Sequence, residues 1–257
     1  MSPSLDDAGS GQAQLVTLVV PCYNEAARLD GNALAHWARR RESHRLILVD
    51  DGSTDETARV LEGIRRTAPD QTEVIRQSRN LGKAEAVRVG MSRALISENG
   101  LAAYWDADLA TPLDEVDAFV AIFDRTTACD IVLGSRVQLL GRRIERRRAR
   151  HYLGRVFATF ASLVLGLAVY DTQCGAKMFR ANDRTRSLFA SPFLSRWVFD
   201  VEVLARYRAA VGRIDPADTR VVEYPLRVWR DVPGSKVKAV HFLTATADLL
   251  RIARRYR

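Results

Sequence analysis

The feature that most constrains the fold is an alternation of short apolar runs with helical segments in the first half of the chain. Five apolar runs are predicted to be strands, at residues 15–21, 45–50, 73–77, 101–106 and 130–134. Four helices are predicted between them, at residues 25–41, 54–66, 83–97 and 112–125. Continuous apolar strands that alternate with helices indicate a mostly parallel sheet covered on both faces. The predicted fold class is therefore α/β.

The rest of the chain is predicted to belong to the same domain. Residues 1–14 are small and polar. Because they lack a basic start and an apolar run, we expect a flexible tail and no signal peptide. Residues 15–257 are expected to form one domain, with a further strand near 219–224 and a C-terminal amphipathic helix over 236–257.

Residues 142–170 combine an arginine cluster with an uncharged run, which begins at residue 156. The uncharged run is shorter than the roughly twenty apolar residues that a membrane-spanning helix needs. Two interpretations remain open: a helix buried in the domain, or a basic and apolar helix that faces the membrane interface. In the second case the arginines outside catalysis contact lipid headgroups or solvent, namely Arg142, Arg143, Arg147 and Arg148.

The chain carries a formal net charge of +8, which favours an anionic partner: nucleic acid, phospholipid or a phosphorylated substrate. A nucleic-acid-binding protein is disfavoured, because no such motif is present and the basic residues lie beside an apolar segment. The three cysteines are widely spaced and form neither a metal-binding pattern nor a disulfide framework. They are typical of a reducing cytoplasm.

Polar clusters follow four of the predicted strands, at residues 21–25, 50–53, 106–108 and 134–136. Each cluster alone is a weak signal, since Asp, Asn and Gly are ordinary turn residues. Parallel strands end at one edge of their sheet, and ligands bind at that edge. Four polar strand ends therefore predict one common site.

The pair Asp106 and Asp108 is the strongest candidate within these clusters. Two carboxylates one residue apart, after an apolar strand, can reach one divalent cation, and Mg²⁺ or Mn²⁺ commonly bridges carboxylates to substrate phosphates. The alternative is that Asp108 only caps the following helix. Residues 80–83 open another helix, where backbone N–H groups and Lys83 can approach a phosphate. The spacing of a Walker loop is absent, which disfavours a P-loop nucleotidase.

Eight blocks in order carry a family resemblance: VVPCYNEAARL (19–29), LVDDGSTDET (48–57), NLGKAEAVRVG (80–90), DAD (106–108), GSR (134–136), DTQCGAKMF (171–179), RWVFDVEVL (196–204) and PGSK (233–236). Together they resemble glycosyltransferase family 2, and within it the dolichyl- and polyprenyl-phosphate sugar synthases. The DTQCGxK and RWxFDxE patterns are most similar to dolichyl-phosphate β-glucosyltransferases. The resemblance implies a GT-A fold and inverting transfer from UDP-glucose or GDP-mannose to a polyprenyl phosphate.

The resemblance also implies roles for individual residues. The nucleotide-sugar would be bound by Pro21, Tyr23, Glu25, Asp50, Asp51, Lys83, Asp106, Ser235 and Lys236. The metal, Mg²⁺ or Mn²⁺, would be bound by Asp106 and Asp108. The acceptor phosphate would be held by Arg136, Arg146 and Arg150, and Asp171 would lie near the sugar. The catalytic residues would be Asp108, Asp200, Arg136 and Lys177.

The sequence departs from the family in two places. Mannosyl relatives often carry Gln where this chain has Ala110, which weakens the mannosyl assignment and leaves the third metal ligand open. The transmembrane anchor of many relatives is not recognised here. Since Ala110 weakens the mannosyl assignment, UDP-glucose is the favoured donor, with GDP-mannose or a UDP-N-acetylhexosamine as alternatives. Transfer to a soluble acceptor is the second enzyme hypothesis. We expect a cytoplasmic protein, peripheral on the cytoplasmic face of an anionic membrane.

Overall fold

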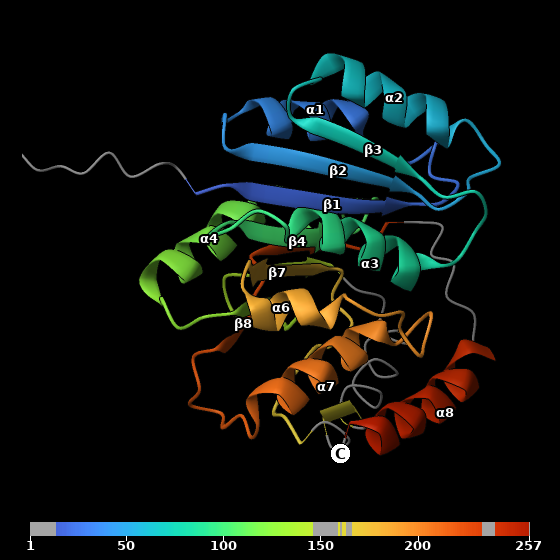
Figure 1. Ribbon diagram of the computed structural model, residues 1–257. Coiled ribbons are helices and arrows are strands. Elements are labelled where there is room, and N and C mark those ends of the chain that lie inside the picture. The colour runs from blue at the N-terminus through green and yellow to red at the C-terminus, as the bar shows by residue number, and fades with distance from the viewer. Residues whose placement is uncertain (1–13, 146–158, 160, 163–165, 233–239, 257) are drawn as a thin grey trace, which may run out of the picture.

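The computed structural model describes residues 14–145, 159, 161–162, 166–232 and 240–256 (Figure 1). The elements follow in chain order: β1 (Val16–Cys22), α1 (Gly31–Arg39), β2 (His44–Asp50), α2 (Thr57–Thr67), β3 (Thr72–Arg76), α3 (Lys83–Ala94), β4 (Leu101–Trp105), α4 (Glu115–Arg125), β5 (Ile131–Ser135), β6 (Arg143–Glu145), β7 (Ala176–Arg180), α6 (Asp183–Leu188), α7 (Phe199–Val211), β8 (Val221–Pro225), β9 (Val228–Arg230) and α8 (Val240–Arg255). Residues 1–13 of the predicted tail lie outside this description.

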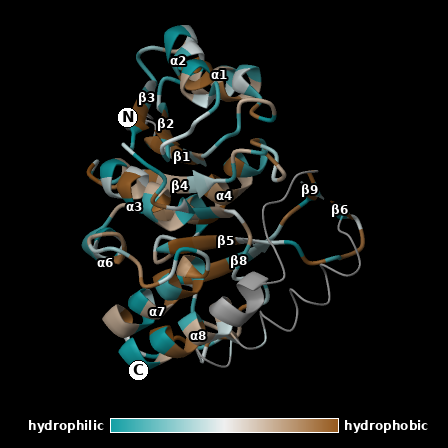
Figure 2. Ribbon diagram, turned by 90° about the vertical axis from the view of Figure 1, so that its right-hand side faces the viewer, coloured by the Kyte–Doolittle hydropathy of each residue, from teal (hydrophilic) through white to brown (hydrophobic). Residues whose placement is uncertain are grey.

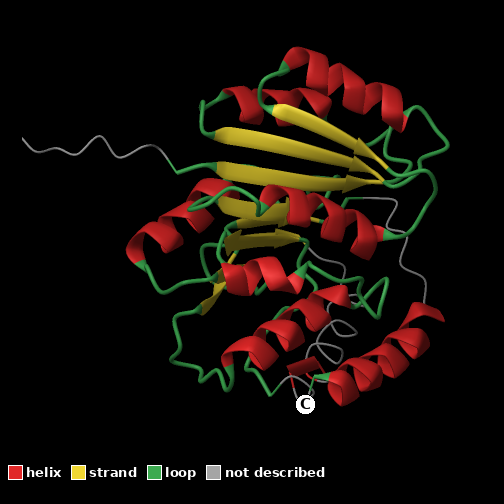
Figure 3. Ribbon diagram, viewed as in Figure 1, coloured by secondary structure: helices red, strands yellow, loops and turns green. Residues whose placement is uncertain are grey.

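A seven-stranded sheet with the order β3-β2-β1-β4-β7-β5-β8 forms the centre of the structure (Figure 3). Strands β3, β2, β1 and β4 pair in parallel, and so do β5 and β8. Strand β7 lies between β4 and β5 and runs antiparallel to both. The predicted α/β class with a mostly parallel sheet is thus confirmed. Strands β6 and β9 form a separate two-stranded parallel pair.

The two faces of the sheet are covered by different helices, because successive strand residues point to opposite sides. In β1, Leu18 and Val20 pack into a cluster with residues of α1, α2 and α4. Val19, between them, packs into a second cluster with residues of α3, α6, α7 and α8. Figure 2 shows the result, with the hydrophobic strand β5 inside and hydrophilic stretches on the helices around it.

The five predicted strands of the first half are confirmed as β1 to β5, but three predicted helices begin later than expected. The helix predicted from residue 54 begins at Thr57. The helix predicted from residue 25 begins at Gly31, because Arg28 N and Leu29 N both donate to Glu25 O in a preceding turn. Asp30 then caps the helix by accepting from Ala33 N at 2.9 Å. The helix predicted from residue 112 begins at Glu115, after a turn in which Glu115 N donates to Pro112 O.

The helix predicted over residues 142–170 is wrong at both ends. Arg143–Glu145 is strand β6, in which Ile144 is buried between two exposed residues and pairs with Trp229 of β9. Near the other end, Gly166 has a φ of 59°, which ends helical geometry. Residues 146–158 lie outside the described part. Within the described ranges, no helix is both long enough and apolar enough to cross a membrane. The predicted C-terminal helix is found as α8 (Val240–Arg255), and residues 236–239 and 257 of the prediction lie outside the described residues.

The close packing of α3 on the sheet predicts a large effect of one methyl group. A Cβ at Gly90 would lie 2.3 Å from Val19 Cγ1 and 2.9 Å from Val49 Cγ2. We expect Gly90→Ala to lower the free energy of unfolding by about 1–3 kcal/mol, measured by urea denaturation. Gly63→Ala is the control, since a Cβ there meets nothing within 4 Å and alanine favours the exposed face of helix α2. Equal stability of the two variants would contradict this account of the packing.

Candidate functional site

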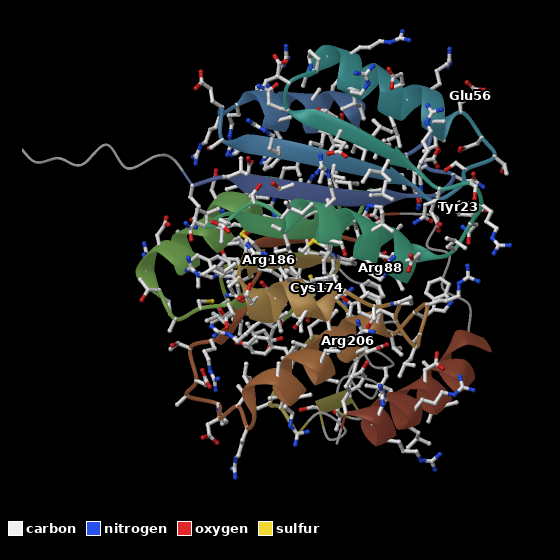
Figure 4. All side chains as sticks on the ribbon, viewed as in Figure 1. Tyr23, Glu56, Arg88, Cys174, Arg186 and Arg206 are labelled. Carbon is white, nitrogen blue, oxygen red and sulfur yellow. The ribbon has the colours of Figure 1, made fainter. Side chains whose placement is uncertain are left out.

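The polar clusters predicted from the sequence meet at the carboxyl edge of the sheet. Strands β1 and β2 end side by side, and Asp51 N donates to Cys22 O at 2.8 Å. Tyr23, labelled in Figure 4, lies at this edge. Because β7 is antiparallel, it begins where β4 ends, so residues 171–175 reach the same edge from the second half of the chain. The structure thus brings the predicted polar clusters and residues 171–175 to one edge of the sheet.

Lys83 and Asp106 form an ion pair at the centre of this edge. Lys83 is the first residue of α3, and its Nζ lies 2.5 Å from Asp106 Oδ1, with the two side chains 37% and 36% exposed. Partial burial disfavours the ionised carboxyl, but the Lys83 ammonium outweighs this and holds the pKa of Asp106 below its usual value. The structure thus brings together a phosphate-binding candidate and a metal-ligand candidate.

Asp108 lies in the turn that follows β4 and is not a helix cap. Its Oδ1 accepts from Ala110 N at 3.1 Å, whereas α4 begins only at Glu115 with Asp114 at its N-cap. The alternative role as a cap for that helix is therefore wrong. Burial and the neighbouring charge of Asp106 raise the pKa of Asp108 above its usual value.

The donor chemistry of this carboxylate pair fits a hard divalent cation. Within the described ranges, no group of three or more His, Cys, Asp or Glu side chains could hold a metal ion. Asp106 and Asp108 would consequently supply only part of a coordination shell. Mg²⁺ is commonly bound in this way, through one or two carboxylates with substrate phosphates and water completing the shell.

Gly175 packs against the Asp106 carboxylate. Asp106 N donates to Gly175 O at 3.1 Å, and a Cβ at Gly175 would lie 1.8 Å from Asp106 Oδ2. Any side chain at this position would displace the carboxylate. Gly175 therefore fixes where Asp106 can lie, a role that the motif DTQCGAK did not reveal by itself.

Asp200 is held by two buried donors from neighbouring strands. Tyr104 of β4 and Lys177 of β7 are register partners, and Tyr104 Oη and Lys177 Nζ each donate to Asp200 Oδ1 at 2.6 Å. Lys177 has no exposed surface and also donates to Cys174 O. Burial and the Asp200 charge raise the pKa of Tyr104 well above its usual value, so its hydroxyl remains a donor. Sequence reasoning missed Tyr104, which reads as an ordinary core residue of a strand.

Arg136 follows β5 and is gripped by Asp171. Its Nε donates to Asp171 Oδ2 at 2.7 Å, its Nη2 donates to Oδ1 at 2.8 Å, and its backbone N donates to Oδ2 at 3.1 Å. Burial opposes the charge, but Asp171 outweighs it and raises the pKa of Arg136. The guanidinium also lies over the Trp229 ring, 5.5 Å from its centroid. The fork that was predicted to hold a phosphate is bound to a carboxylate in this structure.

Asp51 fastens the loop before α3 to the end of β2. Its two carboxylate oxygens accept from Leu81 N at 2.7 Å and Gly82 N at 2.9 Å. Arg196, another residue that sequence reasoning missed, holds the same loop through Asn80 Oδ1 at 3.0 Å. Asp51, predicted to contact the nucleotide, thereby positions Lys83 as well.

The other predicted nucleotide-binding residues of β1 and β2 lie at the same edge. Asp50 is buried and its Oδ1 accepts from Ser53 N at 2.9 Å. Glu25 is buried and forms an ion pair with Arg28, 2.6 Å long. Pro21 is the penultimate residue of β1. Their contacts with a ligand stay predictions. Four further predicted site residues lie outside the described residues: Arg146, Arg150, Ser235 and Lys236.

The Gly175 contact yields a test that depends on geometry alone. We expect Gly175→Ala to push the Asp106 carboxylate aside by about 1 Å or more and to lower catalytic efficiency by roughly a hundredfold. The measurement is kcat/KM for the sugar transfer that the family resemblance implies, alongside thermal unfolding to establish that the variant is folded. Gly63→Ala serves as the matched control in an exposed helix. A folded Gly175→Ala protein with full activity would show that the position of Asp106 is unimportant.

Comparison with known proteins shows which family the chain belongs to. Residues 17–184 match the family model described as Glycosyl transferase family 2. The chain is 32% identical to a dolichyl-phosphate β-glucosyltransferase of Trichomonas vaginalis, covering 92% of this chain and 70% of that protein. It is also 32% identical to the human protein of the same name, covering 99% of this chain and 78% of that one.

A solved structure shows the same fold. The glucosyl-3-phosphoglycerate synthase of Mycobacterium tuberculosis, in complex with Mn²⁺, UDP and glucosyl-3-phosphoglycerate, matches with a TM-score of 0.64. The match covers 94% of this chain and 81% of that one at 18% identity, which supports the predicted GT-A-like fold. The family model and the relatives together identify the chain as a glycosyltransferase, a member of glycosyl transferase family 2.

Proposed function

We propose that this enzyme transfers glucose from a nucleotide-sugar, with UDP-glucose favoured, to dolichyl phosphate or another polyprenyl phosphate. The observation that carries the proposal is the Lys83–Asp106 pair at the carboxyl edge. The Lys83 ammonium can bind a diphosphate, and the carboxylates of Asp106 and Asp108 can bind the metal ion that accompanies it. The names of the relatives, dolichyl-phosphate β-glucosyltransferases, support the sugar and the acceptor.

On this proposal, Asp106 and Asp108 would hold a Mg²⁺ or Mn²⁺ ion, which would supply Lewis-acid neutralisation of the departing diphosphate. Lys83 would then exchange Asp106 for a phosphate oxygen of the donor. Tyr23, Glu25, Asp50 and the end of β1 would surround the nucleoside. Solved structures with the same fold contain UDP together with Mn²⁺ or Mg²⁺, which supports the choice of metal and donor class.

The acceptor phosphate is already ionised near neutral pH, so it needs placement beside the anomeric carbon more than a strong base. Arg136 would provide that placement when its fork passes from Asp171 to the phosphate, aided by Arg146 and Arg150 as the resemblance implies. Asp200 would orient the sugar, and fully buried Lys177 would act by positioning Asp200. Attack opposite the leaving group would invert an α-linked donor to a β-linked product.

A soluble phosphorylated acceptor is the second candidate. A solved structure with the same fold is that of a glucosyl-3-phosphoglycerate synthase, which was also solved with phosphoglyceric acid, a soluble phosphorylated compound. We favour a polyprenyl phosphate as the acceptor, because the relatives at 32% identity are named for dolichyl phosphate. It also includes a peripheral location on the cytoplasmic face of an anionic membrane, supported by the arginines that follow β6 in the sequence.

A donor and acceptor panel tests the proposal. Purified protein is given radiolabelled UDP-glucose, GDP-mannose or UDP-N-acetylglucosamine, each with dolichyl phosphate or with 3-phosphoglycerate. We expect label from UDP-glucose in the lipid fraction only, as an acid-labile β-linked product. Transfer from GDP-mannose alone, or to 3-phosphoglycerate alone, would replace the proposed sugar or acceptor with the alternative.

The metal assignment predicts a large loss of activity when either carboxylate is removed. We expect Asp106→Asn and Asp108→Asn each to lower kcat/KM by a factor of about 100 or more, since each removes one charge from the metal site. EDTA should abolish transfer, and added Mn²⁺ should restore it in the wild type. Asp114→Asn, a change in an exposed side chain beyond the turn, is the control. Activity that survives EDTA and both substitutions would refute the metal role.

A further inference from the structure

The segment between β5 and β6 ends in a turn that presents two leucines to solvent. Leu140 is 103% exposed and Leu139 is 49% exposed. Arg142 N donates to Leu139 O at 3.1 Å, and Gly141 has a φ of 77°, so residues 139–142 form a tight turn with Leu140 at its apex. We call residues 139–142 the leucine turn.

The leucine turn is held away from the core by its own base. Ile144, two residues beyond the turn, is buried and pairs with Trp229 of β9. The Arg142 guanidinium lies over the Tyr224 ring, 5.9 Å from its centroid. A single exposed leucine is ordinary on a protein surface. Two adjacent leucines here lie on a turn that is anchored by the Ile144 and Arg142 contacts, and they form an exposed apolar tip. Exposure of this apolar surface to water is unfavourable.

The described charges at the tip match an anionic surface. Arg142 lies in the turn and Arg143 is exposed directly after it, against one acid, Glu145. In the sequence alone, four more arginines follow among residues 146–150. Basic residues near anionic headgroups each contribute to membrane attraction. An apolar tip flanked by arginines therefore matches the boundary between lipid headgroups and acyl chains, where apolar groups enter and cations stay at the surface.

The turn is also continuous with the candidate site. Leu140 follows Arg136 by four residues, so a fully extended chain between them spans at most about 14 Å. A polyprenyl phosphate keeps its phosphate at the headgroup level and its chain among the acyl tails. A tip seated in that boundary would bring Arg136 toward the depth at which such a phosphate lies.

We propose that the leucine turn inserts into the headgroup boundary of an anionic lipid bilayer and docks the carboxyl edge of the sheet on the membrane. Its link to the acceptor rests on the proposed function, whereas the membrane contact itself can be tested without any turnover. A partner protein is the less favoured occupant, because the tip is convex and its flanking charges are almost all of one sign.

The test is flotation of the full chain with vesicles made of a three-to-one mixture of phosphatidylcholine and phosphatidylglycerol. We expect the wild type to float and L139S/L140S to bind between about tenfold and a hundredfold more weakly, from the lost burial of two leucine side chains. The matched control is Ile96→Ser. Ile96 is 62% exposed and lines a cavity with Leu15 and Thr17 at the opposite edge of the sheet. This control should float like the wild type.

Two readouts separate membrane docking from a folding defect and from self-association. Thermal unfolding of L139S/L140S should match the wild type, since both side chains are exposed, and transfer to a short water-soluble prenyl phosphate should be unchanged. Wild-type flotation by L139S/L140S would overturn the proposal, as would a leucine-dependent dimer that does not bind vesicles. If no donor is used with any acceptor, the proposed function fails, but leucine-dependent flotation would still support docking.

Discussion

The arrangement of the site depends on one departure from the parallel pattern, the antiparallel insertion of β7 between β4 and β5. The insertion pairs Trp105 with Ala176 and Tyr104 with Lys177. It therefore turns residues 171–175 back to the edge at which Asp106 and Asp108 leave the sheet. A β7 that ran parallel would place these residues at the opposite edge, and neither the Gly175 contact with Asp106 nor the Arg136–Asp171 fork could form.

The buried charges at this edge contribute more to geometry than to stability. A buried ion pair such as Lys177–Asp200 gains little net free energy, because taking both charges out of water offsets their attraction. Breaking such a pair is nevertheless expensive, about 3–5 kcal/mol, since it leaves one charge unpaired. The pair and the Tyr104 hydroxyl together leave Asp200 few alternative positions. Rigid placement of this kind is what a transfer site requires of its carboxylates.

The sequence predicted the first five strands and the convergence of their polar ends, because apolar runs and strand-end clusters are local signals. It did not predict β7, and it did not show that Lys177 would be buried. A lysine in a short segment reads as exposed, since lysine is almost never buried without a partner. Its partners, Tyr104 and Asp200, come from another strand and from a helix, and only the tertiary structure brings them together. The starts of two helices were predicted too early for a related reason. The turns at Glu25 and Pro112 contain residues that also suit a first helical turn.

The pairing of β4 with β7 also bears on the way this chain reaches its native state. Tyr104 and Asp200 are 96 positions apart, so their contact requires the closure of a long loop before it gives any stabilisation. Contacts this distant in sequence slow folding, and the ribosome releases the first half of the chain well before the second. Strands β1 to β4 can begin to pair during synthesis, before Gly175 is available to contact Asp106 in the turn after β4. The contacts of Asp200 therefore require the second half of the chain, and a chain that stops before α7 would keep six of the seven central strands but lack Asp200.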